Sequence, residues 1–333
     1  MVTKAKDTAA TPAMKQHLDS GNRDAMIVKN VEIGAPLAHS GNCPFWTADL
    51  NTAPVGDEDD PSGEPTVVCN FDHSRLKVSR RTVPMPYTSR HIDVDELHFV
   101  HRGSARFLTE CGEIEAPTGR FVFIARGIGY RVVSQSDDFM SVIFESDQHM
   151  RLEDDVNKAE IPIIYPTLPI SADATPTGTG WVEHFRTRSW SLEVTRETDP
   201  LITMEIANDQ RPVFALDVGT IPAHQPSAPL GVLPFITFRG PSYHLEIAMP
   251  KTAMPFFHRN VRANETVFAH FGNGDRESLL GKVSTPVGSI SNYPKGIDHR
   301  VGERGSESIC LIWETLGDVT LAPNVTAGEA ASR

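Results

Sequence analysis

Residues 254–299 read MPFFHRNVRANETVFAHFGNGDRESLLGKVSTPVGSISNYPKGIDH and carry metal-binding residue types in two spaced blocks. The first block has the pattern H-x-N-x4-E-x6-G, in which the polar side chains are His258, Asn260 and Glu265. The second block has the pattern G-x5-P-x-G-x2-H and ends at His299. Glycine and proline at these positions are typical of turns between short strands. The stretch therefore predicts a β-structure that brings two imidazoles and one carboxylate together.

The spacing of the first block suits ligands on one side of a strand. Side chains alternate between the two faces of a strand, so His258 and Asn260 point to the same side. Glu265 is out of phase by one residue, and a bulge or loop before it would return it to that side. Two imidazoles and one carboxylate with open coordination positions are typical of non-haem Fe(II) oxygenases. Any one of these residues alone is more often a core histidine or a surface glutamate, but the spaced set predicts a metal site at His258, Glu265 and His299.

The composition favours a duplicated β-protein that does not bind polyanions. The chain has 333 residues, which exceeds the usual size of one domain, and 39% of them are hydrophobic. The 25 prolines and 24 glycines indicate many turns between short strands. The net charge of −12 at pH 7 argues against nucleic acids and anionic membranes as partners.

The cysteines and the N-terminus favour a cytoplasmic protein. Cys43, Cys69, Cys111 and Cys310 are far apart and form no C-x-x-C pair, which is typical of reduced thiols. The first residues lack an apolar segment of signal-peptide length, and no apolar run approaches the length of a membrane span. We therefore expect a soluble, cytoplasmic chain with no membrane partner.

Patterning divides the chain into five segments. Residues 1–65 are predicted to be a polar tail followed by an extended arm. Residues 66–150 and 235–322 each read as a series of short strands, typical of a β-barrel or sandwich. Residues 151–234 are predicted to be a linker with additional strands, and residues 323–333 a small, polar C-terminal tail.

An internal repeat relates the two series of strands. A shift of 169 positions places the second series on the first without a gap. The matched pairs at the positions of the ligand blocks are His258 with Ser89, Asn260 with His91, Glu265 with Glu96, and His299 with Tyr130. The first half thus keeps two ligand-type residues, which are too few to bind a divalent metal tightly. We expect one metal per chain, in the second barrel, and a metal-free, structural first barrel.

The two blocks resemble the signature blocks of the cupin family, with Asn260 in place of the usual second histidine. This resemblance implies an all-β bicupin, with two tandem jelly-roll β-barrels and an N-terminal arm. The segment Pro255–Asn260 resembles the metal block of homogentisate 1,2-dioxygenase, and residues 95–132 resemble the metal-free half of that enzyme. The similarity covers residues 66–144 and 235–315.

The length of the chain is closer to that of the large, iron-bearing subunit of two-component hydroquinone 1,2-dioxygenases. The resemblance implies Fe(II) held by His258, Glu265 and His299, with Asn260 next to the metal. In homogentisate dioxygenases the glutamate commonly stands one residue sooner, at the position of Asn264, whereas Glu265 has the general cupin spacing. The implied reaction is cleavage of a para-dihydroxylated aromatic ring, such as that of hydroquinone or homogentisate, with both atoms of O2 entering the product.

Four further side chains are candidates for contact with the substrate. Asn260 would bind the substrate or O2, act as a weak ligand, or hold His258 in place. Phe256 shares strand parity with His258 and would line the pocket or pack in the core. Tyr293 precedes the turn of the second block, and His244 lies in the strand before the first block.

Two other functions compete with the dioxygenase. One is a different metal-dependent cupin enzyme, an isomerase or hydrolase that uses Zn2+ or Mn2+, because the ligand set does not select the metal. The other is a non-catalytic bicupin that serves as a partner subunit. The expected partners are a small aromatic substrate, O2, a small companion subunit and further copies in a homo- or hetero-oligomer.

Overall fold

The computed structural model describes residues 25–27, 45–168, 180–202, 211–223, 234–249, 258–272, 274–278, 281–304 and 308–327. Regular structure in these ranges is almost entirely β. The helical elements among them are short: α2 (Asp154–Lys158), η1 (Pro200–Ile202) and η2 (Val218–Thr220). The position predicted for Phe256 lies outside the described residues.

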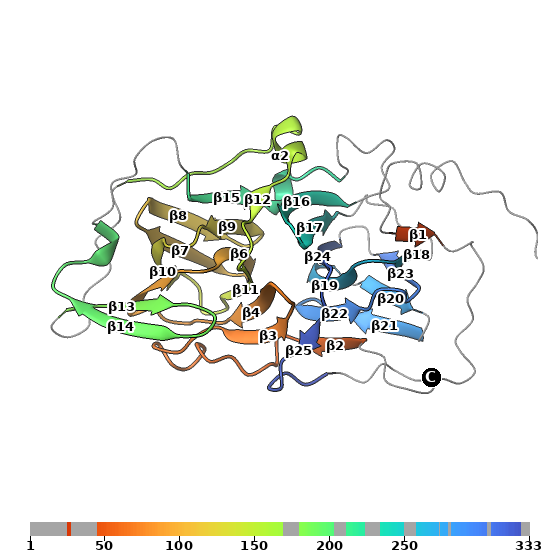
Figure 1. The fold of residues 1–333 in the computed structure, drawn as a ribbon, viewed down its shortest axis with the longest axis horizontal. Helices are drawn as coiled ribbons and strands as arrows, with labels where there is room; N and C mark the ends of the chain where they lie inside the picture. The colour runs from red at the N-terminus through yellow and green to blue at the C-terminus, as the bar shows by residue number, and fades with distance from the viewer. Residues whose placement is uncertain are drawn as a thin grey trace, which may run out of the picture.

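Two sheets made mainly from the first half form barrel 1 (Figure 1). Its outer sheet contains, in spatial order, β14 (Ser191–Arg196), β13 (Trp181–Arg186), β5 (Tyr87–His91), β10 (Gly129–Ser134), β7 (Ser104–Thr109) and β8 (Gly112–Pro117). Its inner sheet contains β15 (Val213–Asp217), β9 (Arg120–Ile124), β6 (Asp95–Arg102), β11 (Met140–Ser146), β4 (Ser74–Ser79), β3 (Thr66–Asn70) and β25 (Thr320–Leu321). Apolar side chains from both sheets fill the space between them.

Two sheets made mainly from the second half form barrel 2, which lies beside barrel 1 in Figure 1. Its inner sheet contains β12 (Arg151–Leu152), β16 (Phe235–Gly240), β17 (Tyr243–Ala248), β24 (Ile309–Thr315), β19 (Asn264–Phe271), β22 (Ser289–Tyr293) and β2 (Trp46–Asp49). Its outer sheet contains β1 (Ala25–Ile27), β18 (His258–Asn260), β23 (His299–Arg304), β20 (Gly274–Ser278) and β21 (Gly281–Thr285). The chain is thus an all-β bicupin, as its sequence predicts.

The two inner sheets pack against each other, so the molecule has four β-layers. Aromatic rings meet across this contact: Phe144 stacks on Trp313 with ring centroids 6.1 Å apart, and Phe121 lies 6.0 Å from Phe238. One hydrophobic core of buried residues includes side chains from both barrels. Because this interface is apolar and continuous, we expect the barrels to unfold together.

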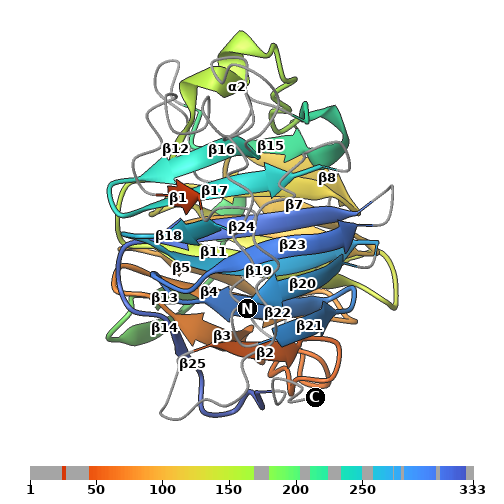
Figure 2. The same ribbon diagram turned by 90° about the vertical axis from the view of Figure 1, so that its right-hand side faces the viewer.

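The 169-residue repeat extends to the exchange of strands between the barrels. Strand β25 follows barrel 2 in the chain but pairs with β3 of barrel 1, and its counterpart β12 follows barrel 1 but pairs with β16. In the same way, β2 pairs with β22 of barrel 2, and β15 pairs with β9 of barrel 1. Figure 2 shows β25 and β2 at one end of the stacked sheets and β12 at the other. Each half therefore completes the inner sheet of the other.

The turn before β23 of barrel 2 has the same backbone conformation as the turn before β10 of barrel 1. Gly127 and Gly296 both have a φ of 83°, in the left-handed region that favours glycine. The backbone N–H of Gly296 donates to the carbonyl of Asn260 at 2.7 Å, and the N–H of Gly127 donates to the carbonyl of His91 at 2.6 Å. This bond ties the turn before His299 to the strand that carries His258.

In the described part of the chain, no helix combines the length and apolar character that crossing a membrane requires.

Candidate metal centre

Three elements of barrel 2 bring His258, Glu265 and His299 together inside the barrel. His258 begins β18 and lies directly opposite His299, the first residue of β23. Glu265 is the second residue of β19, which belongs to the other sheet. A bulge or loop was expected before Glu265, to bring its side chain into phase with His258. The structure has a loop there, at residues 261–263, where the chain passes from one sheet to the other. All three residues are buried, and we call them the triad.

The triad is compact enough to surround one ion. Glu265 Oε2 lies 2.9 Å from His299 Nε2 and 3.7 Å from His258 Nε2, and all three ligand atoms lie within 4.8 Å of one another. The rings of His258 and His299 are 4.4 Å apart, centroid to centroid. A first-row metal ion with ligand bonds of about 2 Å fits between atoms spaced in this way.

The hydrogen bond of His299 indicates what the triad binds. Its Nδ1 lies 2.9 Å from the carbonyl of Ile297, an oxygen that only accepts, so Nδ1 carries a hydrogen. In the neutral ring, Nε2 then presents a lone pair toward the carboxylate of Glu265. Two facing lone pairs require a proton or a metal cation between them. A carbonyl that fixes the imidazole tautomer in this way is typical of metal-ligating histidines, so the residues fit a divalent metal.

The electrostatics of the triad favour an ionised glutamate. Burial alone would raise the pKa of Glu265, but positive charge and hydrogen bonds from the facing imidazoles of His299 and His258, when these are protonated, hold it well below its usual range. A carboxylate that stays ionised throughout the physiological range is ready to bind a metal cation.

Asn260 touches the carboxylates around the triad. Its Nδ2 donates to Glu265 Oε2 at 3.2 Å and to Glu314 Oε1 at 3.3 Å. The side chain of Asn260 thus orients the carboxylate of Glu265. One role expected for Asn260 was to hold His258 in place. Asn260 is buried within barrel 2.

The other predicted residues lie at different distances from the triad. Tyr293 stacks on His299 with ring centroids 4.8 Å apart, and its ring also lies 5.3 Å from that of Phe45, in a tilted arrangement. It is therefore a neighbour of the triad. His244 lies two strands from Glu265 and contacts Glu246 and Glu314 rather than the triad.

Barrel 1 carries a related cluster at the positions matched by the repeat. Tyr130 Oη donates to Glu96 Oε1 at 3.1 Å, which reproduces the contact between His299 and Glu265. His91 Nε2 lies 3.6 Å from Glu96 Oε1 and 3.7 Å from Glu145 Oε1. The structure thus adds Glu145 to the two ligand-type residues that the sequence comparison found there.

A built-in cation accompanies the cluster of barrel 1. The ammonium of Lys77 forms an ion pair with Glu145, and both side chains are almost completely buried. Burial and the charge of Glu145 raise the pKa of Glu96, and burial lowers the pKa of His91 to about 3. A proton on Glu96 and the ammonium of Lys77 together supply the positive charge that a metal would bring.

The sequence reasoning missed Glu246, Glu314, Lys77 and Glu145. The signal was available, because the same 169-residue shift places Lys77 on Glu246 and Glu145 on Glu314. These residues lie outside the two motif blocks, and strand pairing is what brings them to the ligand positions. Glu314 lies directly opposite Glu265 on the neighbouring strand.

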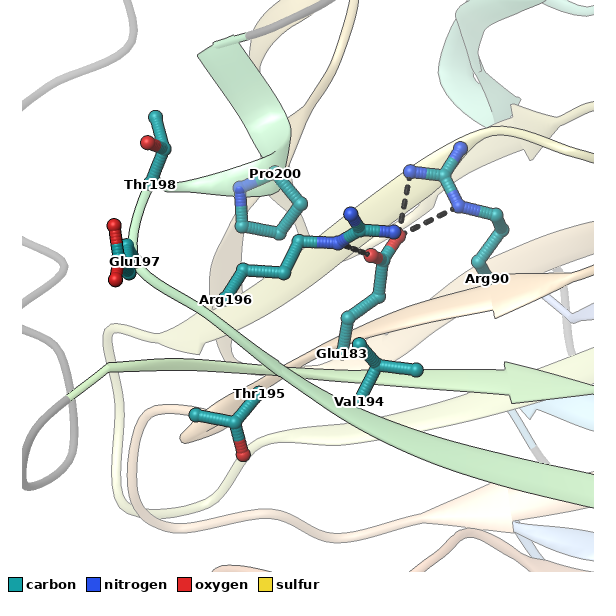
Figure 3. A pocket seen from close by; sticks show the side chains of 8 residues that line it. All are labelled: Arg90, Glu183, Val194, Thr195, Arg196, Glu197, Thr198 and Pro200. Carbon is teal, nitrogen blue, oxygen red and sulfur yellow. Dashed lines mark hydrogen bonds and ion pairs between the residues drawn. The ribbon is translucent and has the colours of Figure 1, made fainter.

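A polar cavity of about 500 Å3 lies beside β14 of barrel 1 (Figure 3). Glu183 lies at its base with no exposed surface, and its two carboxylate oxygens accept hydrogen bonds from Arg90 and Arg196. Arg90 also binds both oxygens of Glu110, at 2.7 and 2.8 Å. The charges of this cavity are balanced within the protein, which favours a structural role for the ion pairs.

Comparisons with known proteins give no sequence relative and only distant structural likenesses. No protein-family model matches the chain, and no curated protein matches its sequence. Among solved structures, a cupin 2 conserved barrel domain protein from Leptotrichia buccalis aligns with a TM-score of 0.42 and 11% identity, covering 76% of this chain and 91% of that chain. A variant of oxalate decarboxylase from Bacillus subtilis aligns with a TM-score of 0.46 and 8% identity, covering 86% of this chain and 81% of that chain. Protein Ylba from E. coli aligns with a TM-score of 0.43 and 8% identity, covering 85% of this chain and 96% of that chain. At these identities neither ligand nor activity is carried over, and the cupin fold with its candidate metal-binding groups rests on the sheets and side chains described above.

Proposed function

We propose that the chain is a non-haem Fe(II)-dependent dioxygenase that opens the ring of a para-dihydroxylated aromatic of the hydroquinone or homogentisate type. The metal dependence of this proposed activity rests on the convergence of His258, Glu265 and His299, with a lone pair of His299 directed at the carboxylate. The substrate class is supported by the resemblance of residues 66–144 and 235–315 to such dioxygenases.

The residues of barrel 2 have distinct tasks in this reaction. The triad would hold Fe(II), and the bound iron supplies a centre at which a substrate phenolate and O2 meet as neighbours. Ile297 fixes the tautomer of His299, and Tyr293 supports the ring by stacking on it. Asn260 keeps the carboxylate of Glu265 in place. Burial of the triad excludes bulk water, which strengthens its electrostatic contacts.

The proposed setting is a cytoplasmic oligomer that includes a small companion subunit. The described cysteines Cys69, Cys111 and Cys310 are free thiols in buried positions, as is typical of a reducing compartment. Burial raises the pKa of the Cys111 thiol to about 11, which disfavours the reactive thiolate.

The test is oxygen uptake by protein loaded anaerobically with one equivalent of Fe(II), using hydroquinone, homogentisate and gentisate as substrates. We expect uptake with at least one of them and its loss in Glu265→Gln. The matched control is Glu96→Gln, which changes the repeat-related glutamate of barrel 1 and should leave uptake intact. Uptake that appears only after a small companion protein is added supports the two-component form.

Two outcomes would contradict the proposal. Tight binding of Zn2+ or Mn2+ by wild-type protein, without oxygen uptake with any of the three substrates, would favour another metal-dependent cupin reaction. Metal content that is equally low in the wild type and in Glu265→Gln would favour a non-catalytic partner subunit.

A further inference from the structure

His244, Glu246 and Glu314 form a second group of metal-ligand side chains in barrel 2, here called the side cluster. His244 Nε2 lies 3.0 Å from Glu246 Oε1 and 3.4 Å from Glu314 Oε2. The ligand atoms of the three residues lie within 4.8 Å of one another. His244 is directly opposite Glu314 on the neighbouring strand, and Glu246 is two residues further along the same face.

The charges of the side cluster are not balanced by its own residues. Glu246 and Glu314 are both buried, with 6% and 8% of their surface exposed. Two buried carboxylates that approach the same imidazole nitrogen repel each other and lose hydration, so a cation bound between them would be stabilised. An imidazolium at His244 would supply one positive charge for two negative ones.

The internal repeat provides a reference for this position. The residues of barrel 1 that match His244, Glu246 and Glu314 are Arg75, Lys77 and Glu145. Both Arg75 and Lys77 form ion pairs with Glu145, so barrel 1 supplies two permanent cations for one carboxylate. The same framework in barrel 2 has two carboxylates and no permanent cation at the matched positions. Barrel 2 thus has the carboxylate of Glu246 where barrel 1 has the ammonium of Lys77. This place in barrel 2 favours a cation taken up from solution.

The side cluster is accessible to an ion from solution. A cavity of about 160 Å3 reaches His244 and Glu314, and its other lining residues include Arg239 and Arg262. The His244 side chain is 19% exposed, whereas the His258 and His299 side chains of the triad are 4% and 2% exposed. A hydrated cation can therefore reach the side cluster more easily than the triad.

We propose that the side cluster binds a divalent transition-metal ion at a second site, through His244 Nε2 and one oxygen each from Glu246 and Glu314. One imidazole and two carboxylates suit Mn2+, Fe2+ or Zn2+. The second oxygen of Glu314, Oε1, accepts from Asn260, whose amide also donates to Glu265 of the triad. The two sites are therefore linked through the side chain of Asn260.

The experiment measures Mn2+ stoichiometry by equilibrium dialysis of metal-stripped full-length protein, with Mn2+ electron paramagnetic resonance as a second readout. Wild-type protein should bind two ions per chain. Glu246→Lys, which copies the arrangement of Lys77 and Glu145, should bind one ion and keep its thermal stability. If Glu246→Lys fails to fold, Glu246→Gln replaces it and should weaken the second site at least tenfold.

Two further variants separate this site from the triad. His299→Ala should lose the triad ion and retain the ion of the side cluster. Glu193→Gln removes an exposed carboxylate that also lies 3.1 Å from a histidine, and should still bind two ions. One ion in the wild type that is retained in Glu246→Lys and lost in His299→Ala would overturn the second site, with His244 then serving as a protonated counterion. One ion that is lost in Glu246→Lys and retained in His299→Ala would support the second site and count against the triad.

Discussion

The imidazoles of His101 and His270, which are 169 residues apart in the chain, meet Nδ1 to Nδ1 at a distance of 2.9 Å. They occupy equivalent positions of the repeat, on β6 and β19. Each ring packs edge-on against a phenylalanine of the other barrel. A hydrogen bond between two neutral imidazoles needs one donor and one acceptor, so this pair breaks the symmetry that the repeat otherwise keeps.

The histidine pair predicts loss of stability in mild acid. Burial lowers the pKa of His101 to about 3 and that of His270 to about 4, while the charges near His101 are those of His270 and Arg102. The unfolded chain takes up protons near pH 6.5 but the folded chain does not, so stability is present above this pH and falls as the pH decreases. Between pH 7 and 5 each histidine should lower the free energy of unfolding by about 2 kcal/mol.

Urea unfolding at both pH values should show that the free energy of unfolding depends less on pH in the double variant His101→Gln/His270→Gln. The exposed His149→Gln is the control, and an unchanged pH dependence in the double variant would contradict the assignment.

Asn260 predicts a positioning effect on metal binding. Asn260→Ala removes the amide that donates to Glu265, so we expect Fe(II) affinity to fall about 10- to 100-fold while the fold is kept. Metal titration followed by circular dichroism separates these effects. The exposed Asn157→Ala on α2 is the control. Wild-type affinity in Asn260→Ala would show that the amide is not needed to orient the glutamate.

The paired turns allow a matched test of the backbone before His299. Gly296→Ala and Gly127→Ala place a side chain at the same φ of 83°, and an added Cβ has no neighbour within 4 Å at either position. Each variant should lose about 1 kcal/mol from left-handed strain alone. Only Gly296→Ala should also weaken metal binding, because its turn leads into His299. Equal metal affinity in the two variants would refute this coupling.

The buried ammonium of barrel 1 predicts a large loss of stability on removal. Lys77→Met removes the buried ammonium and leaves Arg75 as the cation paired with Glu145, so it should lower the free energy of unfolding by about 3 kcal/mol in urea unfolding. Lys158→Met is the comparison, since the ammonium of Lys158 is exposed to solvent where it pairs with Asp155 and should contribute much less to stability. A similar small effect at both positions would mean that Lys77 does not balance the charge of barrel 1.

The sequence by itself determined the all-β class, the duplication and the candidate ligands of barrel 2. These features are local, because strand alternation, turn glycines and the spacing of His258, Glu265 and His299 are visible within short stretches. The repeat also places Gly296 on Gly127, and both glycines have the same positive φ. Only the tertiary structure decided which residues touch across neighbouring strands and between the two barrels. Strand register places Glu314 beside Glu265, and the exchange of β12 and β25 depends on packing between sheets that are distant in sequence. The repeat matches His101 with His270, but their contact is a long-range property that the sequence does not show.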